Sequence, residues 1–311
     1  MKNKKEILIV GGTGFIGYHL ARKCLKIGWI VTCISTKKPK SKRFLKRVKY
    51  LICDITKKKI INRNIKNQFD FVVNAGGYVD HSDKKKTYES HFNGTKNLAN
   101  FFLNKKIKSF IQIGSSGEYG DLKSPHYEKN FPRKKPISTY YKSKFLSTIY
   151  LLSLFKKKNF PVTIIRLYQA FGPNQDLNRF IPIIINGCLK DEKFPCSDGK
   201  QFRDFIFIDD VVDAIVKSLN NKKSLGEIIN IGSGKPLKIR NIIESIKYRV
   251  KRGKPNYGEI LLRGDEKIKT YPSIKKAKKI INWSPKITFN LGLNKTINYY
   301  KKNLYNYKID D

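Results

Sequence analysis

Two side chains that could exchange protons lie four positions apart in the chain, Tyr140 and Lys144. Residues at i and i+4 lie on the same face of a helix, and the pattern over 141–157 is helical. An ammonium beside a phenol favours the phenolate and lowers the phenol pKa, which would suit Tyr140 to general acid and base work. Tyr141 has no such partner, since the residue four positions later is Phe145. Taken alone, the spacing is more typical of an ordinary amphipathic helix.

A glycine-rich segment near the N-terminus indicates a phosphate-binding turn. Gly11, Gly14 and Gly17 follow the apolar run Ile7–Val10 and precede a helical pattern over Phe15–Ile27. In a dinucleotide site these glycines give a tight turn, a close approach to the pyrophosphate, and close packing of helix on strand. The pyrophosphate then lies at the positive end of the helix dipole. The alternative is a generic tight turn, but a position between a strand and a helix favours dinucleotide binding.

Short apolar runs alternate with helical patterns along the first half of the chain. Helical patterns occupy 91–104 and 141–157, and the runs are Ile7–Val10, Ile30–Ile34, Val48–Cys53, Phe71–Asn74, Phe110–Ile113 and Val162–Leu167. Strands separated by helices imply a parallel sheet covered on both faces. We therefore predict an α/β fold: a Rossmann-like doubly wound parallel sheet over 1–170 and a smaller C-terminal substrate lobe over 171–311. Within that lobe, 204–220 is expected to return to the first domain.

The charge of the chain is strongly unbalanced. Its 311 residues include 65 Lys and Arg against 24 Asp and Glu, a formal net charge of +41 at pH 7. One interpretation is a polyanionic partner, such as nucleic acid or an acidic membrane surface. The other is compositional background, which we favour because lysine outnumbers arginine and is spread along the whole chain. We predict no nucleic-acid partner.

The cysteines and histidines show no metal-ligand or disulfide pattern. No CxxC pair occurs among the five cysteines, which are Cys24, Cys33, Cys53, Cys188 and Cys196. The apolar run after the basic N-terminus is too short for a signal peptide, and Ile181–Ile185 is far too short to span a membrane. We predict a soluble, cytoplasmic protein with reduced thiols, no metal and no membrane insertion.

Further motifs follow the glycine turn in a fixed order. They are Asp54-Ile55, Asn74-Ala75-Gly76-Gly77, Asn93-Gly94-Thr95, Arg166-Leu167 with Gly172-Pro173, the stretch 198–211 (DGKQFRDFIFIDDV), Asn230-Ile231-Gly232-Ser233-Gly234 and Trp283-Ser284-Pro285. Together they resemble the extended short-chain dehydrogenase/reductase family, the NAD(P)-dependent epimerases, dehydratases and reductases of nucleotide sugars. The resemblance runs nearly end to end. It implies a nucleotide-diphosphate sugar as substrate and a homodimer formed through the helices at 91–104 and 141–157.

The resemblance also implies a catalytic group made of Ser115, Tyr140 and Lys144. Ser115 lies four residues before the tyrosine of Tyr119-Gly120. Its hydroxyl would orient the reacting oxygen, with Ser116 as a possible substitute. Tyr140 would take a proton from a sugar hydroxyl or return one to a ketone. Lys144 would also hold the nicotinamide ribose.

Two sets of binding residues follow from the same resemblance. The cofactor set is Gly11, Gly14, Phe15, Ile16, Gly17, Ser35, Lys37, Asp54, Ile55, Asn74, Ala75, Gly76, Asn93, Tyr140 and Lys144. The substrate set is Ser116, Gln169, Arg179 and Arg203, in which the planar guanidinium of Arg203 would grip a diphosphate. Gln169 stands where the family usually has Asn, which leaves the sugar contacts open.

The end of the second strand bears on the choice between NAD and NADP. NAD sites usually carry an Asp or Glu there for the ribose hydroxyls. This chain has Ser35-Thr36-Lys37-Lys38, with hydroxyls and cations that suit a 2′-phosphate. We therefore favour NADP over NAD. The alternative is that Lys37 and Lys38 are two more solvated lysines.

The reaction class is predicted from the residues after Ser115. Family 4,6-dehydratases place an acidic pair, or a glutamate, directly after the catalytic Ser or Thr, whereas Ser116 and Gly117 stand here and Glu118 comes one position late. Dehydration is therefore disfavoured. The chain most resembles 4-ketoreductases of the CDP-abequose synthase kind, so we predict reduction of an NDP-4-keto-6-deoxysugar. The first alternative is an NDP-sugar 4-epimerase, similar to UDP-glucose 4-epimerase. The second is a non-catalytic nucleotide- or RNA-binding protein on the same fold.

Overall fold

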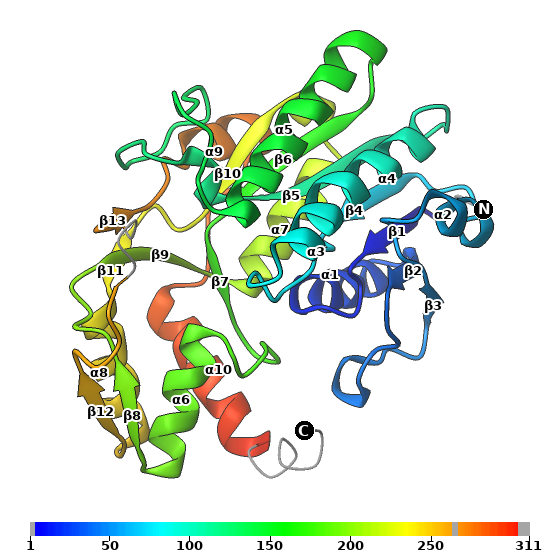
Figure 1. Ribbon diagram of the computed structural model, residues 1–311. Coiled ribbons are helices and arrows are strands. Elements are labelled where there is room, and N and C mark those ends of the chain that lie inside the picture. The colour runs from blue at the N-terminus through cyan, green and yellow to red at the C-terminus, as the bar shows by residue number, and fades with distance from the viewer. Residues whose placement is uncertain (1–3, 263–266, 304–311) are drawn as a thin grey trace.

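A seven-stranded sheet forms the centre of the computed structural model, which describes residues 4–262 and 267–303. The strand order is β10-β6-β5-β4-β1-β2-β3, and every neighbouring pair is parallel (Figure 1). The strands are β1 (Glu6–Val10), β2 (Ile30–Ser35), β3 (Val48–Ile52), β4 (Phe71–Asn74), β5 (Ser109–Ser115), β6 (Val162–Leu167) and β10 (Ile228–Ile231).

Both faces of the central strands are buried, which explains why Ile7–Val10 of β1 is a continuous apolar run. In β1, Ile7 and Ile9 pack into one hydrophobic layer, and Leu8 and Val10 pack into the other. None of the four is more than 3% exposed. The side chains of a strand alternate between the two faces, so a strand buried on both faces has apolar residues at every position.

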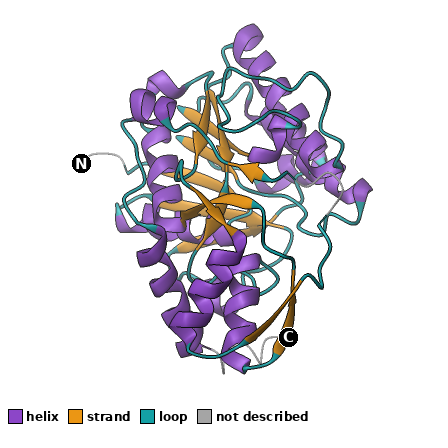
Figure 2. Ribbon diagram, turned by 90° about the vertical axis from the view of Figure 1, so that its left-hand side faces the viewer, coloured by secondary structure: helices purple, strands orange, loops and turns teal. Residues whose placement is uncertain are grey.

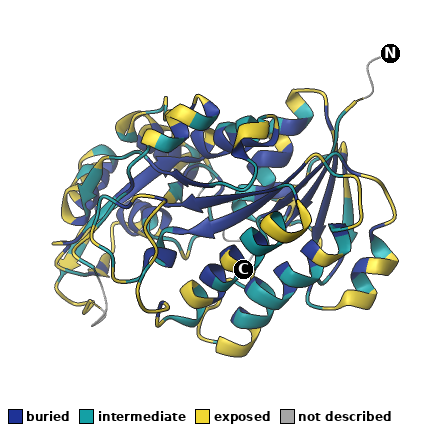
Figure 3. Ribbon diagram, turned by 90° about the horizontal axis from the view of Figure 1, so that it is seen from above, coloured by how far each residue is buried: buried dark blue, intermediate teal, exposed yellow. Residues whose placement is uncertain are grey.

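Helices cover both faces of the sheet. The first layer packs against α1 (Phe15–Lys26) and α7 (Ile208–Leu219). The second packs against α2 (Lys58–Asn64), α4 (Gly94–Phe102) and α5 (Thr139–Lys158). Figure 2 shows helices on both sides of the strands, and Figure 3 shows buried strands beneath helices whose outer faces are exposed. The short connecting helices and turns are α3 (Lys84–Tyr88), η1 (Ser41–Arg43), η3 (Ser116–Tyr119), η4 (Lys222–Ser224) and the π-helical turn η2 (Glu89–Asn93).

The remaining elements form a smaller region beyond the end of β6. One small sheet contains β7 (Gln169–Phe171), β9 (Phe202–Phe207), β11 (Pro236–Lys238) and β13 (Lys269–Thr270), and a second pairs β8 (Lys193–Cys196) with β12 (Lys254–Tyr257). Three helices accompany them, namely α6 (Phe180–Lys190), α8 (Ile239–Val250) and α10 (Phe289–Asn303), whereas α9 (Lys275–Ile281) packs against β10 of the large sheet.

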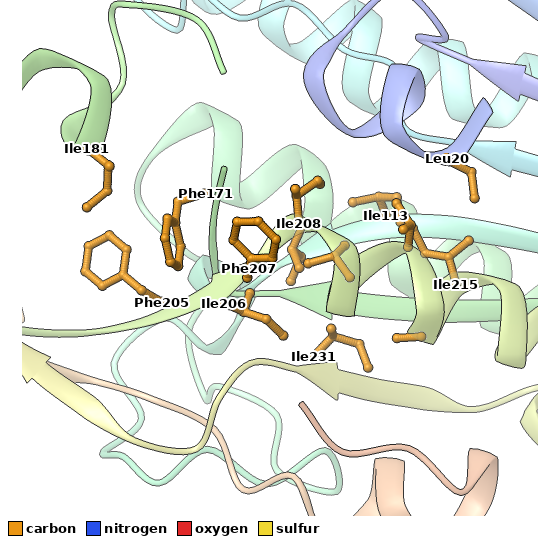
Figure 4. Packing of buried hydrophobic residues seen from close by; sticks show 14 of the residues in the cluster. Leu20, Ile113, Phe171, Ile181, Phe205, Ile206, Phe207, Ile208, Ile215 and Ile231 are labelled. Atoms are coloured by element: carbon orange, nitrogen blue, oxygen red, sulfur yellow. The ribbon is translucent and has the colours of Figure 1, made fainter. Parts of the chain in front are cut away.

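One hydrophobic core joins the two regions. The layer under α1 and α7 continues into the smaller region through Phe171, Phe205 and Phe207. The Phe171 ring centroid lies 6.2 Å from that of Phe205 and 5.7 Å from that of Phe207. In Figure 4 these rings lie between Ile181 on one side and Ile208 on the other. The smaller region is therefore packed onto the sheet through a continuous apolar layer.

The predicted α/β architecture with a Rossmann-like parallel sheet is confirmed. All six predicted strands form, and the predicted helix over 141–157 lies within α5. The pattern over 91–104 begins inside η2 and continues as α4. The seventh strand, β10, was not predicted as a strand. Both β10 and α7 come after residue 171 in the chain, yet they pack with the large sheet. The predicted domain boundary at 170/171 stays a prediction.

The five cysteines are free and buried. Burial raises the pKa of Cys24 and of Cys33 to about 12, so both thiols stay protonated near neutral pH. In the part of the chain that the structure describes, no helix is both long and apolar enough to cross a bilayer.

The glycine turn between β1 and α1 depends on contacts between backbones. Gly11 has φ +73°, a conformation that favours glycine. A Cβ on Gly17 would lie 2.3 Å from the Gly11 carbonyl oxygen and 2.7 Å from the Gly12 Cα. A Cβ on Gly14 would have the Gly11 oxygen at 3.2 Å as its nearest neighbour. The turn therefore tolerates a side chain much less at Gly17 than at Gly14.

We expect Gly17→Ala to lower the free energy of unfolding by about 2 kcal/mol, because the methyl group would force the Gly11 carbonyl and α1 apart. The matched Gly14→Ala should cost about 1 kcal/mol or less, since only one contact has to relax. Urea unfolding of the two variants and the wild type measures the difference. Equal destabilisation by both substitutions would contradict this account of the turn.

Candidate active site

The glycine turn gives an anion a place to bind. The Gly11 N–H donates to the Ile34 carbonyl of β2 at 2.8 Å, and Gly14 is the N-cap residue of α1. Gly14 supplies no side-chain cap, and the first turn of α1 has no acidic residue. The N–H groups at this helix start therefore suit a diphosphate. A Cβ on Gly11 would lie 2.7 Å from the Gly76 Cα, so the loops after β1 and β4 meet through their backbones.

These observations fit a dinucleotide, and the predicted cofactor residues lie at the carboxyl ends of neighbouring strands. Phe15 and Ile16 form the start of α1, Ser35 ends β2, Asn74 ends β4, and Ala75 and Gly76 follow Asn74. Asp54 and Ile55 follow β3. In a parallel sheet these ends meet at one edge, where ligands of such sheets bind. The described residues would therefore hold a dinucleotide along the edge over β1, β2, β3 and β4.

Three of the predicted cofactor residues already use their polar side chains in hydrogen bonds within the protein. The Ser35 hydroxyl accepts a hydrogen bond from the Thr13 hydroxyl at 2.9 Å. The Asp54 carboxylate accepts the N–H of Thr56 at 2.9 Å and its hydroxyl proton at 2.8 Å. Asn74 donates to Gln112 at 2.9 Å and accepts the Gly76 N–H at 3.2 Å. These contacts fix the loops that would line the cofactor, and Lys37 is exposed beyond them.

The predicted catalytic residues lie on two neighbouring elements. Ser115 is the last residue of β5, and Tyr140 and Lys144 lie in the first turns of α5. The Lys144 ammonium donates to the Ile113 carbonyl at 2.7 Å and lies 6.0 Å from the Tyr140 ring centroid. The Ser115 hydroxyl is close enough to the phenol of Tyr140 to act on its pKa through a hydrogen bond. The structure thus brings together the three residues that the sequence placed far apart.

The electrostatics differ from the prediction for the lysine–tyrosine pair. Burial raises the pKa of Tyr140 to about 12, and the neighbouring Tyr141 and Glu118 act in the same direction. Ser115 and Arg179 act in the opposite direction, to lower this pKa. The expectation that Lys144 would bring the phenol pKa toward neutral pH is therefore wrong for the protein without a ligand, because loss of solvation outweighs the opposing effects.

Burial also changes the pKa of Lys144. It lowers the pKa of Lys144 to about 8, while the carboxylate of Glu118 acts to raise it. An ammonium in a site with little water is less stable than one at the surface, since it loses its hydration. Lys144 is therefore charged at neutral pH but loses its proton at moderately alkaline pH.

Two histidines pack around the Tyr140 ring. The His81 ring lies parallel to it, with centroids 4.0 Å apart and an interplanar angle of 14°. His91 meets it edge-on at 4.9 Å, and burial lowers the pKa of His91 to about 2, so this imidazole is neutral. The sequence predicted no metal-ligand role for either histidine and gave neither one a place beside Tyr140. The signal available was the position of His91, three residues before Gly94 of the motif Asn93-Gly94-Thr95.

Asn93 lies away from the catalytic group. It lines a shallow hollow together with Thr56 and Asn97, beside the segment that follows β3. Asn97 donates to the carbonyls of Ile55 and Thr56, at 3.1 and 2.9 Å. Asn93 is thus placed near the segment Asp54-Ile55 rather than near Tyr140, and a cofactor contact there stays a prediction.

The predicted substrate residues come from four elements, namely η3, α6, β7 and β9. Ser116 begins η3 directly after Ser115, and Arg179 stands at the start of α6 and is close enough to Tyr140 to act on its pKa. Gln169 is exposed on β7, where it pairs with Phe205 of β9. Arg203 lies two residues earlier on β9 and donates to the Phe202 carbonyl at 2.7 Å. Their contacts with a sugar nucleotide stay predictions.

Glu118 turns away from the position that an acid catalyst would need. Its carboxylate is fully buried and accepts the Ser115 N–H at 2.7 Å and the Thr148 hydroxyl proton at 2.7 Å. It also forms an ion pair with Arg166 of β6, at 3.1 Å. These contacts occupy both oxygens. Among residues 4–262 and 267–303, no group of three or more His, Cys, Asp or Glu could hold a metal ion.

Comparisons with known proteins agree with this geometry. The chain is 27% identical over 308 residues to a putative UDP-glucose 4-epimerase of Methanocaldococcus jannaschii, covering 96% of this chain and 99% of that protein. It is 25% identical over 327 residues to human dTDP-D-glucose 4,6-dehydratase, covering 98% and 92%. A UDP-glucuronic acid 4-epimerase from Bacillus cereus, solved with UDP-glucuronic acid and NAD, has a TM-score of 0.85 at 25% identity and covers 96% of this chain and 99% of its own.

Most of the chain matches one protein family. Residues 7–232 match the NAD dependent epimerase/dehydratase family, a stretch that begins in β1 and ends just after β10. It includes the glycine turn, Ser115, Tyr140 and Lys144. The chain belongs to the NAD-dependent epimerase/dehydratase family of nucleotide-sugar-modifying enzymes.

Proposed function

We propose that this protein is a nucleotide-sugar 4-epimerase that uses NAD. The observation that carries the proposal is that Ser115, Tyr140 and Lys144 lie together at the same edge of the sheet as the glycine turn, with the carboxylate of Glu118 held inside the protein. Named relatives that act at C4 of UDP-glucose and UDP-glucuronic acid add support. The substrate is expected to be a sugar joined to a nucleoside diphosphate.

Each residue of the site has its own role in the reaction at C4 of the sugar. Bound NAD supplies a hydride acceptor that can later return the hydride. Tyr140 takes the proton of the 4-hydroxyl as the carbonyl forms, and returns it after the ketosugar has turned over in the site. Ser115 orients the same oxygen, and the Lys144 ammonium stabilises negative charge on the phenol. We expect Arg179 and Arg203 to hold the diphosphate through bidentate hydrogen bonds.

The contacts of Glu118 separate this proposal from dehydration. A 4,6-dehydratase needs an acid that reaches the sugar beyond C4, whereas both oxygens of this carboxylate bind protein groups. Reduction of a 4-keto-6-deoxysugar, which we expected from the sequence, has less support because the relatives named above are epimerases and a dehydratase. A homodimer through α4 and α5 stays a prediction, as does a cytoplasmic location.

We expect Tyr140→Phe to lower kcat for interconversion of UDP-glucose and UDP-galactose, or of the corresponding uronates, by at least about 1,000-fold, because the proton acceptor is lost. Binding of NADH, followed by fluorescence, should change by less than about three-fold. Product is measured by chromatography without added reductant, since epimerisation consumes no cofactor overall. Near-normal turnover by the variant would overturn the role of Tyr140, and stoichiometric loss of NADPH with a 4-ketosugar would favour a reductase.

We expect kcat/KM to fall as the pH rises through about 8. The pKa of Lys144 is lowered to about 8 by burial, so the ammonium exists below this pH and loses its charge above it. A pH–rate profile measures the fall. In a Lys144→Arg variant the cation persists to much higher pH, so any residual activity should show no fall near pH 8. A wild-type profile that stays flat to pH 10 would contradict this assignment.

We expect NADH to bind at least as tightly as NADPH, contrary to the preference predicted from Ser35, Lys37 and Lys38. The Ser35 hydroxyl already accepts from Thr13, and the exposed lysines are screened by salt. Fluorescence titration of both reduced cofactors gives the ratio. Ser35→Asp should weaken NADPH more than NADH, because the new carboxylate would repel a 2′-phosphate. A ten-fold preference of the wild type for NADPH would restore the original prediction.

A further inference from the structure

The buried pair of Glu118 and Arg166 stands directly behind the catalytic group. Both side chains are 0% exposed, and the Arg166 Nε lies 3.1 Å from the Glu118 Oε2. The Arg166 guanidinium lies 4.4 Å from the ring centroid of Tyr119 and 5.3 Å from that of Phe131. Two charges removed from water gain little net stability over an apolar pair of the same size. Fold stability alone therefore does not explain why this pair is charged.

The carboxylate of Glu118 connects four elements of the site. Its Oε1 accepts the N–H of Ser115 at the end of β5, and its Oε2 accepts the hydroxyl proton of Thr148, one turn after Lys144 on α5. Arg166 comes from β6, in register with Gly114 of β5. A Cβ on Gly114 would lie 2.4 Å from the Glu118 Oε1, so the carboxylate fills the space that this glycine leaves.

The contact with Ser115 is reciprocal. The Ser115 hydroxyl accepts the backbone N–H of Glu118 while the Glu118 carboxylate accepts the Ser115 N–H, which together form a capping box for η3. The Ser115 hydroxyl also accepts the Gly117 N–H at 3.2 Å. This box fixes the backbone of Ser115 at the point where β5 ends and η3 begins. The buried side chain of Glu118 thus sets the position of the Ser115 hydroxyl beside Tyr140.

We propose that Glu118 is a positioning residue for the reaction at C4: its carboxylate holds Ser115 at the end of β5 and supplies the negative charge that faces the Lys144 ammonium. The inference rests on the proposed roles of Ser115, Tyr140 and Lys144. In this proposal Glu118 acts from the protein interior, whereas a dehydratase would require an acid in contact with the substrate.

The charges around Lys144 support this assignment. Glu118 of η3 acts to raise the pKa of Lys144, against the effect of burial. The other groups facing this part of the site are the neutral His91 of η2, His81 before α3, Tyr140 and Tyr141 of α5, Arg179 before α6, and Arg166 of β6. Glu118 carries the one carboxyl group among these side chains. Without its charge, Lys144 should lose its proton at lower pH.

Three variants separate positioning from simple stability. Glu118→Gln alone leaves the buried Arg166 unpaired and is expected to unfold readily. The double variant Glu118→Gln with Arg166→Met removes both charges and should restore the urea midpoint to near the wild-type value. Thr148→Val is the matched control, since it removes one hydrogen bond to the same carboxylate but keeps the charge and the Ser115 contact.

For the double variant we expect a loss of kcat of at least about 30-fold, with the sugar KM and the NADH Kd within about three-fold of wild type. The alkaline fall in its pH–rate profile should move to lower pH by at least about half a unit. Thr148→Val should keep kcat within about three-fold. A stable double variant with wild-type kcat would overturn the proposal, as would a loss of kcat accompanied by an equal loss of NADH binding.

A measurement without substrate distinguishes this proposal from the proposed function. The side-chain amine resonance of Lys144 in protein labelled with 15N-lysine, assigned by comparison with Lys144→Met, gives its pKa directly. We expect a lower value in the double variant than in the wild type even if no nucleotide sugar is turned over. An unchanged Lys144 pKa would overturn the role of Glu118 and leave the epimerase proposal intact.

Discussion

All seven strands of the large sheet run in the same direction, and this constraint decides where chemistry can take place. Each strand leaves the sheet at the same edge, so the residues that follow β1, β2, β3, β4 and β5 are neighbours in space although they span more than a hundred positions in sequence. Backbone N–H groups at the start of α1 face this edge, and helices on both faces keep water from the strands. The site therefore depends on strand direction before it depends on any single side chain.

Local patterns in the sequence were sufficient for the elements that bury an unbroken apolar run. The strands from β1 to β6 and the glycine turn belong to this group. Their apolar runs indicate burial, and the helical patterns between them indicate that the strands are parallel. β10 was missed since Ile228–Ile231 follows a loosened pattern in which strands, loops and short helices mix. What identifies it as a strand is its pairing with β6, sixty residues earlier, and no local pattern encodes such a contact.

The candidate site was predictable where spacing along one helix determines proximity. Tyr140 and Lys144 meet this condition, and Ser115 was found by resemblance alone. Glu118 and His81 were not recognised, because their neighbours come from other elements: Thr148 and Arg166 for the first, Tyr140 for the second. The pKa of Tyr140 was also mispredicted, since spacing shows the nearby cation but not how much solvent the fold removes from the phenol. Of the many cations, Arg43, Lys144 and Arg166 are buried, and each donates to an oxygen of the protein.

The hydrophobic layer that continues from the large sheet into the smaller region limits how a substrate can enter. In enzymes whose two lobes meet at a polar cleft, the lobes open and close as rigid bodies about a hinge. Here such a rotation would pull the cluster of Phe171, Phe205 and Phe207 away from the apolar layer under α1 and α7 and expose aromatic surface, at about 25 cal/mol for each Å². We therefore expect a ligand to enter past the loops at the carboxyl edge, such as the one that carries His81 over Tyr140, while the two regions keep their relative positions.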